Sequence, residues 1–385
     1  MAPQPLIVVS LEGITPNALS CYGCSWNRTP SLDQLCASGS IWDRMVACSD
    51  ESNFILEQWI CDKSEWVAPY RKLGSTSLFA DQSLEQLTDH CFDEITIIPV
   101  EPVTESQIPC EEVFETRFGQ LIATAIQRLN EPDPASVIWI HSDFLTKCWD
   151  APLPMDEVDS GEELEDGIIP DDETLWTHED KIEDSAIPPH DMLPPQVIPP
   201  NFIIQAEDDP DLLPQWMDRY AAQVRLIDGM MGYLMDEANQ RGARLVFTGT
   251  SGFRLGQNSE FGFQTTKLRS SDICLPLLVS GHGPIRVPHL TSSAQLPELL
   301  KMIGSGVKAL CSAEQWAESR SRPAAIRINS ARCRAAVVNP EWFCVTDCDG
   351  EENLFLKPDD LNDYNNVARL RPDVVDLLTS SEIPE

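Results

Sequence analysis

Basic residues are scarce in this sequence. The 385 residues include 27 Lys or Arg against 62 Asp or Glu, which gives a net charge of −35. A protein that binds a nucleic-acid backbone or an anionic membrane surface needs a cationic face. The shortage of basic side chains therefore excludes both functions, and we expect neither a nucleic-acid partner nor a membrane partner.

Long apolar runs and a basic leader are also lacking. No segment approaches the roughly 18 apolar residues of a membrane span. The chain begins Met-Ala-Pro-Gln-Pro and passes directly into the short apolar run 6–9, without a basic region before it. This beginning predicts that there is no signal peptide, so we expect a cytoplasmic protein.

The cysteines show no disulfide pattern. There are 13 of them, an odd number, scattered over the whole length. In a chain without an export signal they are typical of reduced thiols. Cys21 with Cys24 and Cys344 with Cys348 could hold zinc only as two distant pairs, and no other Cys/His spacing supports such a site.

Acidic residues are abundant and unevenly distributed. Residues 153–215 contain 19 Asp or Glu, one Lys and ten prolines, and so carry about half of the net charge. Prolines and mutually repelling charges disfavour a regular helix or a central strand there. Three interpretations of this acidic insertion remain open, namely a solvated insertion or lid, a docking strip for a basic protein partner, and a weak calcium site.

On both sides of the insertion, short buried strands alternate with amphipathic helices. At 42% hydrophobic residues, the chain can bury a large core. This alternation predicts an α/β fold, a mostly parallel central sheet with helices on both faces. Strands are expected at 6–9, 77–80, 95–98, 137–140, 244–248 and 273–280, and helices at 30–38, 112–129, 224–241 and 296–303.

The last 70 residues have a different pattern of apolar residues from the rest of the chain. Short alternating runs at 325–328, 335–338 and 343–345 indicate a small antiparallel sheet, and a terminal helix is expected near 372–378. We therefore predict an α/β domain over 1–315, which includes the acidic insertion, and a small C-terminal antiparallel α+β subdomain over 316–385.

Several segments resemble, in the same order along the chain, the signature motifs of sulfatases of the alkaline phosphatase superfamily. The first resembles the family pattern that ends in L-G-C-Y-G, and the next resembles T-P-N-L-D-x-L. Later segments resemble L-R-x-x-G-Y, H-x-x-x-P-H, Y-x-A-x-V-x-x-x-D, F-T-S-D-H-G and E-L-Y-D-L. The matching residues are 11–23, 29–35, 71–74, 141–152, 220–228, 247–252, 353–355 and 359–368. The resemblance covers nearly the whole chain outside the acidic insertion and implies the sulfatase-like fold.

The same resemblance implies a site that this sequence only partly retains. Sulfatases use a divalent metal, commonly calcium, held by carboxylates, and a formylglycine nucleophile made from a Cys or Ser inside C/S-x-P-x-R. The first metal-ligand position matches Glu12, which is still a carboxylate. The Asp-His pair of F-T-S-D-H-G matches Thr250 and Ser251, which bring neither charge nor imidazole.

The remaining catalytic positions are equally incomplete. The nucleophile position matches Ser52, but the residues around it lack the Pro and Arg of the motif. The first His of H-x-x-x-P-H matches His141 and the second matches Thr146. Lys267 matches loosely the lysine that faces the sulfate. Ser52, His141 and Lys267 are thus the candidate catalytic residues and Glu12 the candidate metal ligand, all expected to be vestigial.

Three functions follow from these residues. One carboxylate offers a hard dication too few ligands, and a serine without an adjacent base is a weak nucleophile. We therefore expect a catalytically degenerate, sulfatase-like binding or regulatory module that needs no cofactor. The alternative is an active sulfuric- or phosphoric-ester hydrolase with a rearranged site that uses Ca or Mg. The third is an interaction protein that binds a basic partner through 153–215.

Overall fold

The computed structural model describes residues 4–61, 65–81, 90–99, 103–104, 107–152, 196–264, 266–281, 283–304 and 324–380. Its centre is a nine-stranded sheet in the order β10-β2-β11-β7-β1-β5-β3-β4, with β12 paired to β2. The strands are β1 (Leu6–Leu11), β2 (Ser40–Val46), β3 (Thr76–Ala80), β4 (Glu94–Ile97), β5 (Val137–Ser142), β7 (Arg244–Gly249), β10 (Cys274–Leu275), β11 (Leu277–Val279) and β12 (Ile285–Ser292). The middle of the sheet is parallel, whereas β10 and β11 run antiparallel to their neighbours.

Strand β1 shows why this sheet forms. All six of its residues are buried, as expected of a parallel strand that is covered on both faces. It pairs in parallel with β5 on one side and with β7 on the other. In this register Ser10 lies opposite His141, and Leu11 lies opposite Ser142. The carboxyl ends of the three strands therefore meet at one edge.

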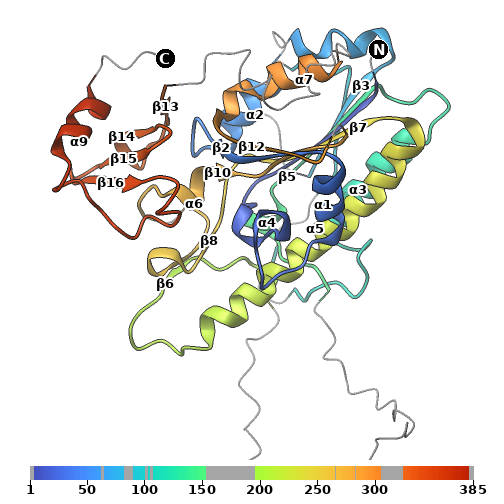
Figure 1. The fold of residues 1–385 in the computed structure, drawn as a ribbon. Helices are drawn as coiled ribbons and strands as arrows, with labels where there is room; N and C mark the ends of the chain where they lie inside the picture. Colours follow the sequence, from blue (N-terminus) through green and yellow to red (C-terminus); the bar gives the residue numbers. More distant parts are fainter. Residues whose placement is uncertain are drawn as a thin grey trace, which may run out of the picture.

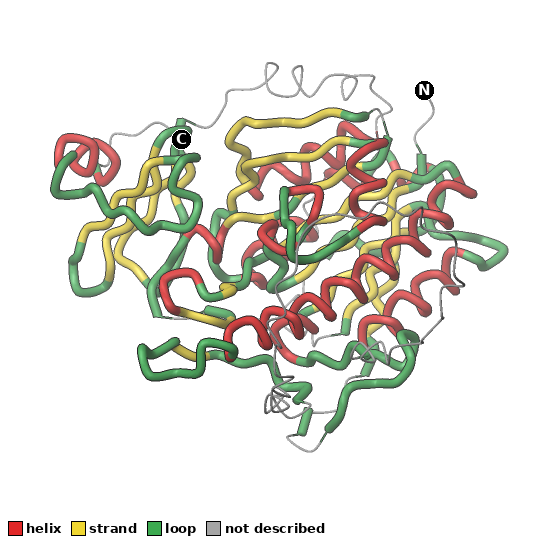
Figure 2. Tube along the Cα trace, turned by 60° about the horizontal axis from the view of Figure 1, so that its bottom comes forward, coloured by secondary structure: helices red, strands yellow, loops and turns green. Residues whose placement is uncertain are grey.

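Helices cover both faces of the sheet (Figure 1). The helices are α1 (Pro30–Ser38), α2 (Ser52–Ile60), α3 (Arg117–Leu129), α4 (Phe144–Lys147), α5 (Leu212–Arg241), α6 (Ser270–Ile273), α7 (Leu296–Gly304) and α9 (Pro372–Thr379). The buried faces of α1, α3 and α5 share one core with Ile7 and Val9 of β1. The buried faces of α2 and α7 share the other core with Leu6 and Val8. The tube trace shows the sheet enclosed between these two groups of helices (Figure 2).

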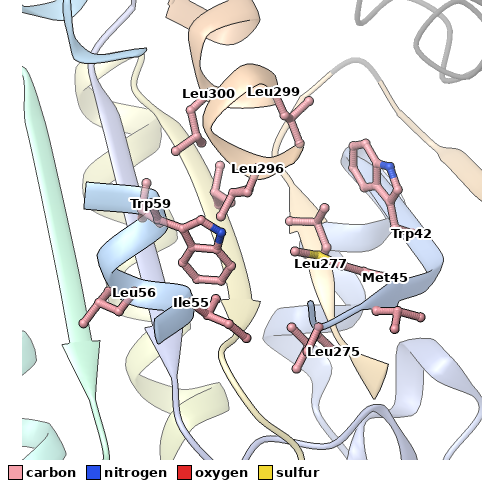
Figure 3. Packing of buried hydrophobic residues seen from close by; sticks show 14 of the residues in the cluster. Trp42, Met45, Ile55, Leu56, Trp59, Leu275, Leu277, Leu296, Leu299 and Leu300 are labelled. Carbon is pink, nitrogen blue, oxygen red and sulfur yellow. The ribbon is translucent and has the colours of Figure 1, made fainter. Parts of the chain in front are cut away.

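The core under α2 and α7 is built from tryptophan and aliphatic side chains. Figure 3 shows Trp59 of α2 and Leu296 and Leu300 of α7 packed close together over the sheet. The Trp59 indole N–H donates a 2.8 Å hydrogen bond to the Ser293 carbonyl oxygen, so this ring is satisfied although it is fully buried. Burial of such large rings anchors α2, whose first residue is Ser52.

The C-terminal region forms a separate four-stranded antiparallel sheet in the order β13-β14-β15-β16. Its strands are β13 (Ile326–Arg327), β14 (Cys333–Val338), β15 (Trp342–Asp347) and β16 (Glu352–Leu356). One face packs against α9, and the other face adds Phe343 and Phe355 to the core under α2 and α7. The expected α/β fold with a small antiparallel C-terminal part is confirmed. The predicted domain boundary at 315/316 lies outside the described residues.

Several element boundaries differ from those expected. Helix α3 begins at Arg117 rather than at residue 112, because the Thr116 hydroxyl caps it by accepting a hydrogen bond from the Gly119 N–H. The strand expected at 273–280 is divided by Pro276 into β10 and β11. Helix α5 begins at Leu212, so its first turn lies inside the segment that was expected to be irregular.

A third sheet of three short strands is formed by segments within the α/β part of the chain. It has the order β6-β9-β8, with β6 (Phe202–Ile203), β8 (Arg254–Leu255) and β9 (Glu260–Gly262). Strand β6 also lies within the segment 153–215, whereas residues 153–195 are outside the described part of the chain. Among the residues that the structure describes, no helix has the length and apolar character needed to cross a membrane.

Candidate functional site

Four of the residues singled out from the sequence lie together at the carboxyl edge of the central sheet. Glu12 follows β1, Ser251 follows β7, Thr146 lies in α4 just after β5, and Ser52 is the first residue of α2. Ligands of open α/β sheets bind at this edge, because the loops after the parallel strands converge there. We call Glu12, Ser52, Thr146 and Ser251 the Glu12 group.

Hydrogen bonds join the members of the Glu12 group directly. The Ser251 hydroxyl oxygen accepts a 3.0 Å hydrogen bond from the Gly13 N–H and lies 3.1 Å from the Ser52 hydroxyl oxygen, which donates to it. The Thr146 hydroxyl donates a 2.7 Å hydrogen bond to Glu12 Oε1. These bonds connect the ends of β1, β5 and β7 to the start of α2 without any bound group.

The close approach of these elements requires glycine at position 13. Gly13 has a φ of +80°, in the left-handed region, and an added Cβ would lie 2.6 Å from Cγ2 of Thr146. The site is also nearly closed to solvent, since Glu12 is 8% exposed, Ser52 4% and Ser251 2%. The Glu12 group is therefore an interior contact between strand ends.

Burial dominates the electrostatics of Glu12. Removal from water raises the pKa of the Glu12 carboxyl, and the nearby Asp143 carboxylate raises it further. Hydrogen bonds from Thr146 and Ser52 and the charge of Lys147 lower the pKa by less. Burial therefore disfavours the charged form of the Glu12 carboxyl.

The side chains around Glu12 do not fit the hard dication that the fold would suggest. Calcium and magnesium need about six oxygen ligands, several of them carboxylate or carbonyl oxygens. The Glu12 group offers one carboxyl and three hydroxyls, and the Thr250 hydroxyl donates to the Leu11 carbonyl oxygen. The nearest further carboxylate, Asp143, is bound by Arg117. We therefore assign no metal to this site.

His141 lies inside strand β5 and not in the loop after it. Its Nδ1 is 2.9 Å from the Ser10 hydroxyl oxygen, which also accepts a 2.8 Å hydrogen bond from the Trp139 indole N–H. Burial lowers the pKa of His141 to about 4. Its Nε2 has no hydrogen-bond partner among the described residues. This imidazole is a neutral core group at ordinary pH, and it is not joined to the Glu12 group by hydrogen bonds.

Lys267 is held by the C-terminal sheet. Its ammonium lies 2.8 Å from Asp347 Oδ2 and 2.7 Å from Glu351 Oε2, in the hairpin between β15 and β16, and both hydrogen bonds raise the pKa of Lys267. With Asp349, these carboxylates are the one set of three potential metal ligands found together in the part of the chain that the structure describes. Lys267 already forms ion pairs with two of these carboxylates. No hydrogen bond among the described residues joins Lys267 or this hairpin to the Glu12 group.

The sequence did not single out a buried ionic cluster at the same edge of the sheet. Arg117, at the start of α3, lies 2.8 Å from Asp81 and also contacts Asp143, and we call these three residues the Arg117 cluster. Burial raises the pKa of Asp81 to about 6 despite the neighbouring guanidinium. The signal that could have revealed the cluster is that Asp81 and Asp143 directly follow the strands β3 and β5, which are neighbours in the sheet.

A second ionic network connects the C-terminal sheet to the region before Ser52. Arg332, just before β14, lies 2.6 Å from Asp50 and 3.0 Å from Asp272. Asp272 also lies 2.7 Å from Arg254, which is fully buried. The basic side chains near α2 are thus bound by carboxylates of the protein itself.

Comparison with known proteins identifies the fold. No sequence-family model and no curated protein matches this chain. Among solved structures, it resembles BT1596, a 2-O GAG sulfatase, at 11% identity and a TM-score of 0.62, covering 98% of this chain and 90% of that one. It resembles the phosphonate monoester hydrolase of Agrobacterium radiobacter at 14% identity and a TM-score of 0.62, covering 97% and 93%. The corresponding hydrolase of Silicibacter pomeroyi gives 12% identity and a TM-score of 0.64, covering 98% and 94%.

These similarities extend over nearly the full length of both chains. The protein therefore has the same fold as these sulfatases and phosphonate monoester hydrolases, as the motifs in its sequence predicted.

Proposed function

We propose that this chain is a sulfatase-like protein that has lost sulfatase chemistry and acts as a binding or regulatory module. The observation that carries the proposal is the Glu12 group itself. Where the fold would place a metal and a nucleophile, this chain has hydroxyl groups that bind one another and a single, nearly buried carboxyl. The strand ends are held together by the protein's own side chains.

The surroundings of Ser52 support the absence of an activated nucleophile. A serine hydroxyl becomes nucleophilic when an adjacent base removes its proton. The groups beside the Ser52 hydroxyl are the Ser251 hydroxyl, which is not a base, and the Glu12 carboxyl, whose charged form is disfavoured by burial. The His141 imidazole is bound to Ser10, and the Lys267 ammonium is bound to Asp347 and Glu351. Among the described residues, neither His141 nor Lys267 makes a hydrogen bond to Ser52.

Charge also argues against a sulfate or phosphate ester as the ligand. Such esters require unpaired cations around the anionic group. Arg117, Arg254 and Arg332 are each bound by two carboxylates. In the described residues around α2 and the strand ends, these guanidinium groups are already neutralised, which disfavours an anionic substrate.

The test combines metal analysis with turnover measurements on the purified full chain. We expect no bound dication above background, and no hydrolysis of an aryl sulfate, an aryl phosphate or a phosphonate monoester. Glu12→Ala and Ser52→Ala serve as matched variants, because a contaminating hydrolase would be unaffected by them. Turnover that requires added Ca or Mg and disappears in Glu12→Ala would instead establish the alternative, a hydrolase with a rearranged site.

The proposal includes a basic protein as the partner of the acidic insertion, and a cytoplasmic location. The support is the composition of residues 153–215, which contain 19 acidic side chains and a single lysine. Affinity capture with the full chain and with a chain that lacks 153–195 tests the partner, since a salt-sensitive basic protein should be lost on deletion. If the two chains captured the same proteins, this part of the proposal would be wrong. Cell fractionation tests the location.

A further inference from the structure

An aromatic pair lies on the surface where α3 and α5 pack together. Phe114, just before α3, and Tyr233 of α5 have ring centroids 5.4 Å apart. Phe114 is nevertheless 45% exposed and Tyr233 49% exposed. Single exposed apolar residues are common on protein surfaces, but two aromatic rings in contact form a preferred anchor for a partner. We call Phe114, Tyr233 and the adjacent Gly229 the aromatic patch.

Gly229 lies one helical turn before Tyr233, on the same exposed side of α5. A glycine inside a helix weakens it, so its presence needs a reason. At Gly232 the reason is visible, because an added Cβ would lie 3.1 Å from the Ser31 hydroxyl oxygen of α1. At Gly229 an added Cβ would meet no atom within 4 Å. The packing of the described residues therefore does not require Gly229, whereas the close approach of a partner's backbone would.

Acidic side chains predominate around the aromatic patch. Glu111, Glu112 and Glu115 are exposed on the segment that carries Phe114, and Asp236 is exposed one turn after Tyr233. Arg241, further along α5, is paired with Glu237. The exposed Arg225 lies one turn before Gly229 and is bonded to Asn27. The rim of the patch is thus complementary to a cationic partner.

The acidic insertion begins close to this surface. The Cys110 N–H donates a 2.9 Å hydrogen bond to the Asp150 carbonyl oxygen, so the segment that leads to Phe114 runs beside the chain that precedes residue 153. A cationic segment attracted by the acidic insertion would therefore be drawn to an encounter with this part of the folded body. Long-range attraction between opposite charges speeds such an encounter.

The geometry points to the aromatic patch as a docking site for a protein segment that carries an apolar or aromatic anchor flanked by Lys or Arg. The anchor would pack on the two rings, its backbone would approach α5 at Gly229, and its basic side chains would face the glutamates. This inference deepens the basic-partner part of the proposed function and rests on it, whereas it uses no residue of the Glu12 group.

Selection of peptides on the full chain tests the inference. A random peptide library displayed on phage is selected on the immobilised protein, and the enriched peptides are measured by fluorescence anisotropy. We expect an apolar or aromatic residue flanked by Lys or Arg. The double variant Phe114→Ala/Tyr233→Ala should weaken binding at least about tenfold, as expected of aromatic anchors. Leu370→Ala, at a residue that is 77% exposed elsewhere, is the matched control and should change binding less than about twofold.

Two further variants separate docking from folding and from general charge attraction. Gly229→Leu places a side chain in open space on a helix, so the chain should fold and yet bind the peptide at least about tenfold more weakly. Glu112→Lys/Glu115→Lys should weaken binding and reduce its dependence on salt. Failure to enrich such peptides, or equal binding by the wild type and Gly229→Leu, would overturn the inference. So would a dimer, seen by sedimentation, that the double aromatic variant abolishes, because the occupant would then be a second copy.

Discussion

The Glu12 group and the Arg117 cluster lie at the same edge of the central sheet, yet different interactions hold them. The Glu12 group is joined by hydrogen bonds between hydroxyls and one carboxyl. The Arg117 cluster is joined by a buried guanidinium between two carboxylates. The fold would place its chemistry at the Glu12 group, but the formal charge is concentrated at the neighbouring cluster.

This difference teaches that two groups at one edge of a sheet can be held by interactions of very different strength. A buried ion pair becomes indispensable once formed, because removal of one partner leaves the other charge unpaired in a dry environment. A pair of buried hydroxyls costs less to break, since each lost hydrogen bond involves neutral groups. The Arg117 cluster should therefore matter more for stability than the Glu12 group.

Removal of Arg117 should have the largest effect. Arg117→Met leaves Asp81 and Asp143 buried without their cation and should lower the free energy of unfolding by about 3–5 kcal/mol. Chemical denaturation at pH 7.5 measures it. Arg71→Met is the control, because the Arg71–Asp93 pair is about half exposed and should contribute less than about 1 kcal/mol. Equal losses in the two variants would remove the contrast between the cluster and a surface pair.

Removal of the Ser251 hydroxyl should have the next largest effect. Ser251→Ala removes the hydroxyl that accepts from Ser52 and one of the two acceptors of the Gly13 N–H, which keeps its bond to the Ser251 carbonyl oxygen, at a cost of about 1 kcal/mol. The same denaturation experiment measures this cost. Ser25→Ala, at an exposed serine, controls for loss of a hydroxyl and should be nearly neutral. A loss as large as that of Arg117→Met would mean that the two groups are held equally strongly.

The pH dependence of stability should distinguish the cluster further. Burial raises the pKa of Asp81 to about 6, above about 3.9 in an unfolded chain. Its contribution to stability is therefore complete below pH 4 and lost as the pH rises through 6. Between pH 5 and 7.5 this group should lower the free energy of unfolding by about 1 kcal/mol. Asp81→Asn should flatten this part of the profile, and an unchanged profile would contradict the assignment to Asp81.

Neutralisation of Glu12 should have the smallest effect. Glu12→Gln keeps an oxygen to accept the Thr146 hydrogen bond and removes a carboxyl whose pKa is raised by burial. We expect the free energy of unfolding at pH 7.5 to stay the same or rise, by less than about 1 kcal/mol. The matched variant is Thr146→Val, which removes the hydroxyl that donates this hydrogen bond to position 12. A loss of stability well above this value in Glu12→Gln would show that the fold needs a charged Glu12.

Much of the fold could be predicted from local patterns. The apolar run of β1, the spacing of apolar residues along α5 and the stop at Gly242 each depend on neighbours in sequence, and each was found. Strand β2 was not expected, because Asp43 and Arg44 interrupt its apolar residues. It is stabilised instead by pairing with β10, β11 and β12, which lie more than 200 residues away.

The candidate site could be predicted only in part. The motifs singled out Glu12, Ser52, Thr146 and Ser251 separately, and the structure places them together because each follows or begins an element of the sheet. The roles of His141 and Lys267 depended on distant partners, namely Ser10 and the hairpin around Asp347. The Arg117 cluster was missed for the same reason, since Arg117 is 36 residues from Asp81 in sequence.

The order of residues alone establishes an acidic chain with a proline-rich insertion, a sulfatase-like succession of strands and helices, and a set of motifs without the Asp-His pair. These properties reside in composition and short-range periodicity. Which side chains close the strand ends, which arginines are neutralised and which aromatic rings remain exposed are decided only when distant segments pack together. Burial and pairing between remote residues set these energies, and no local pattern contains them.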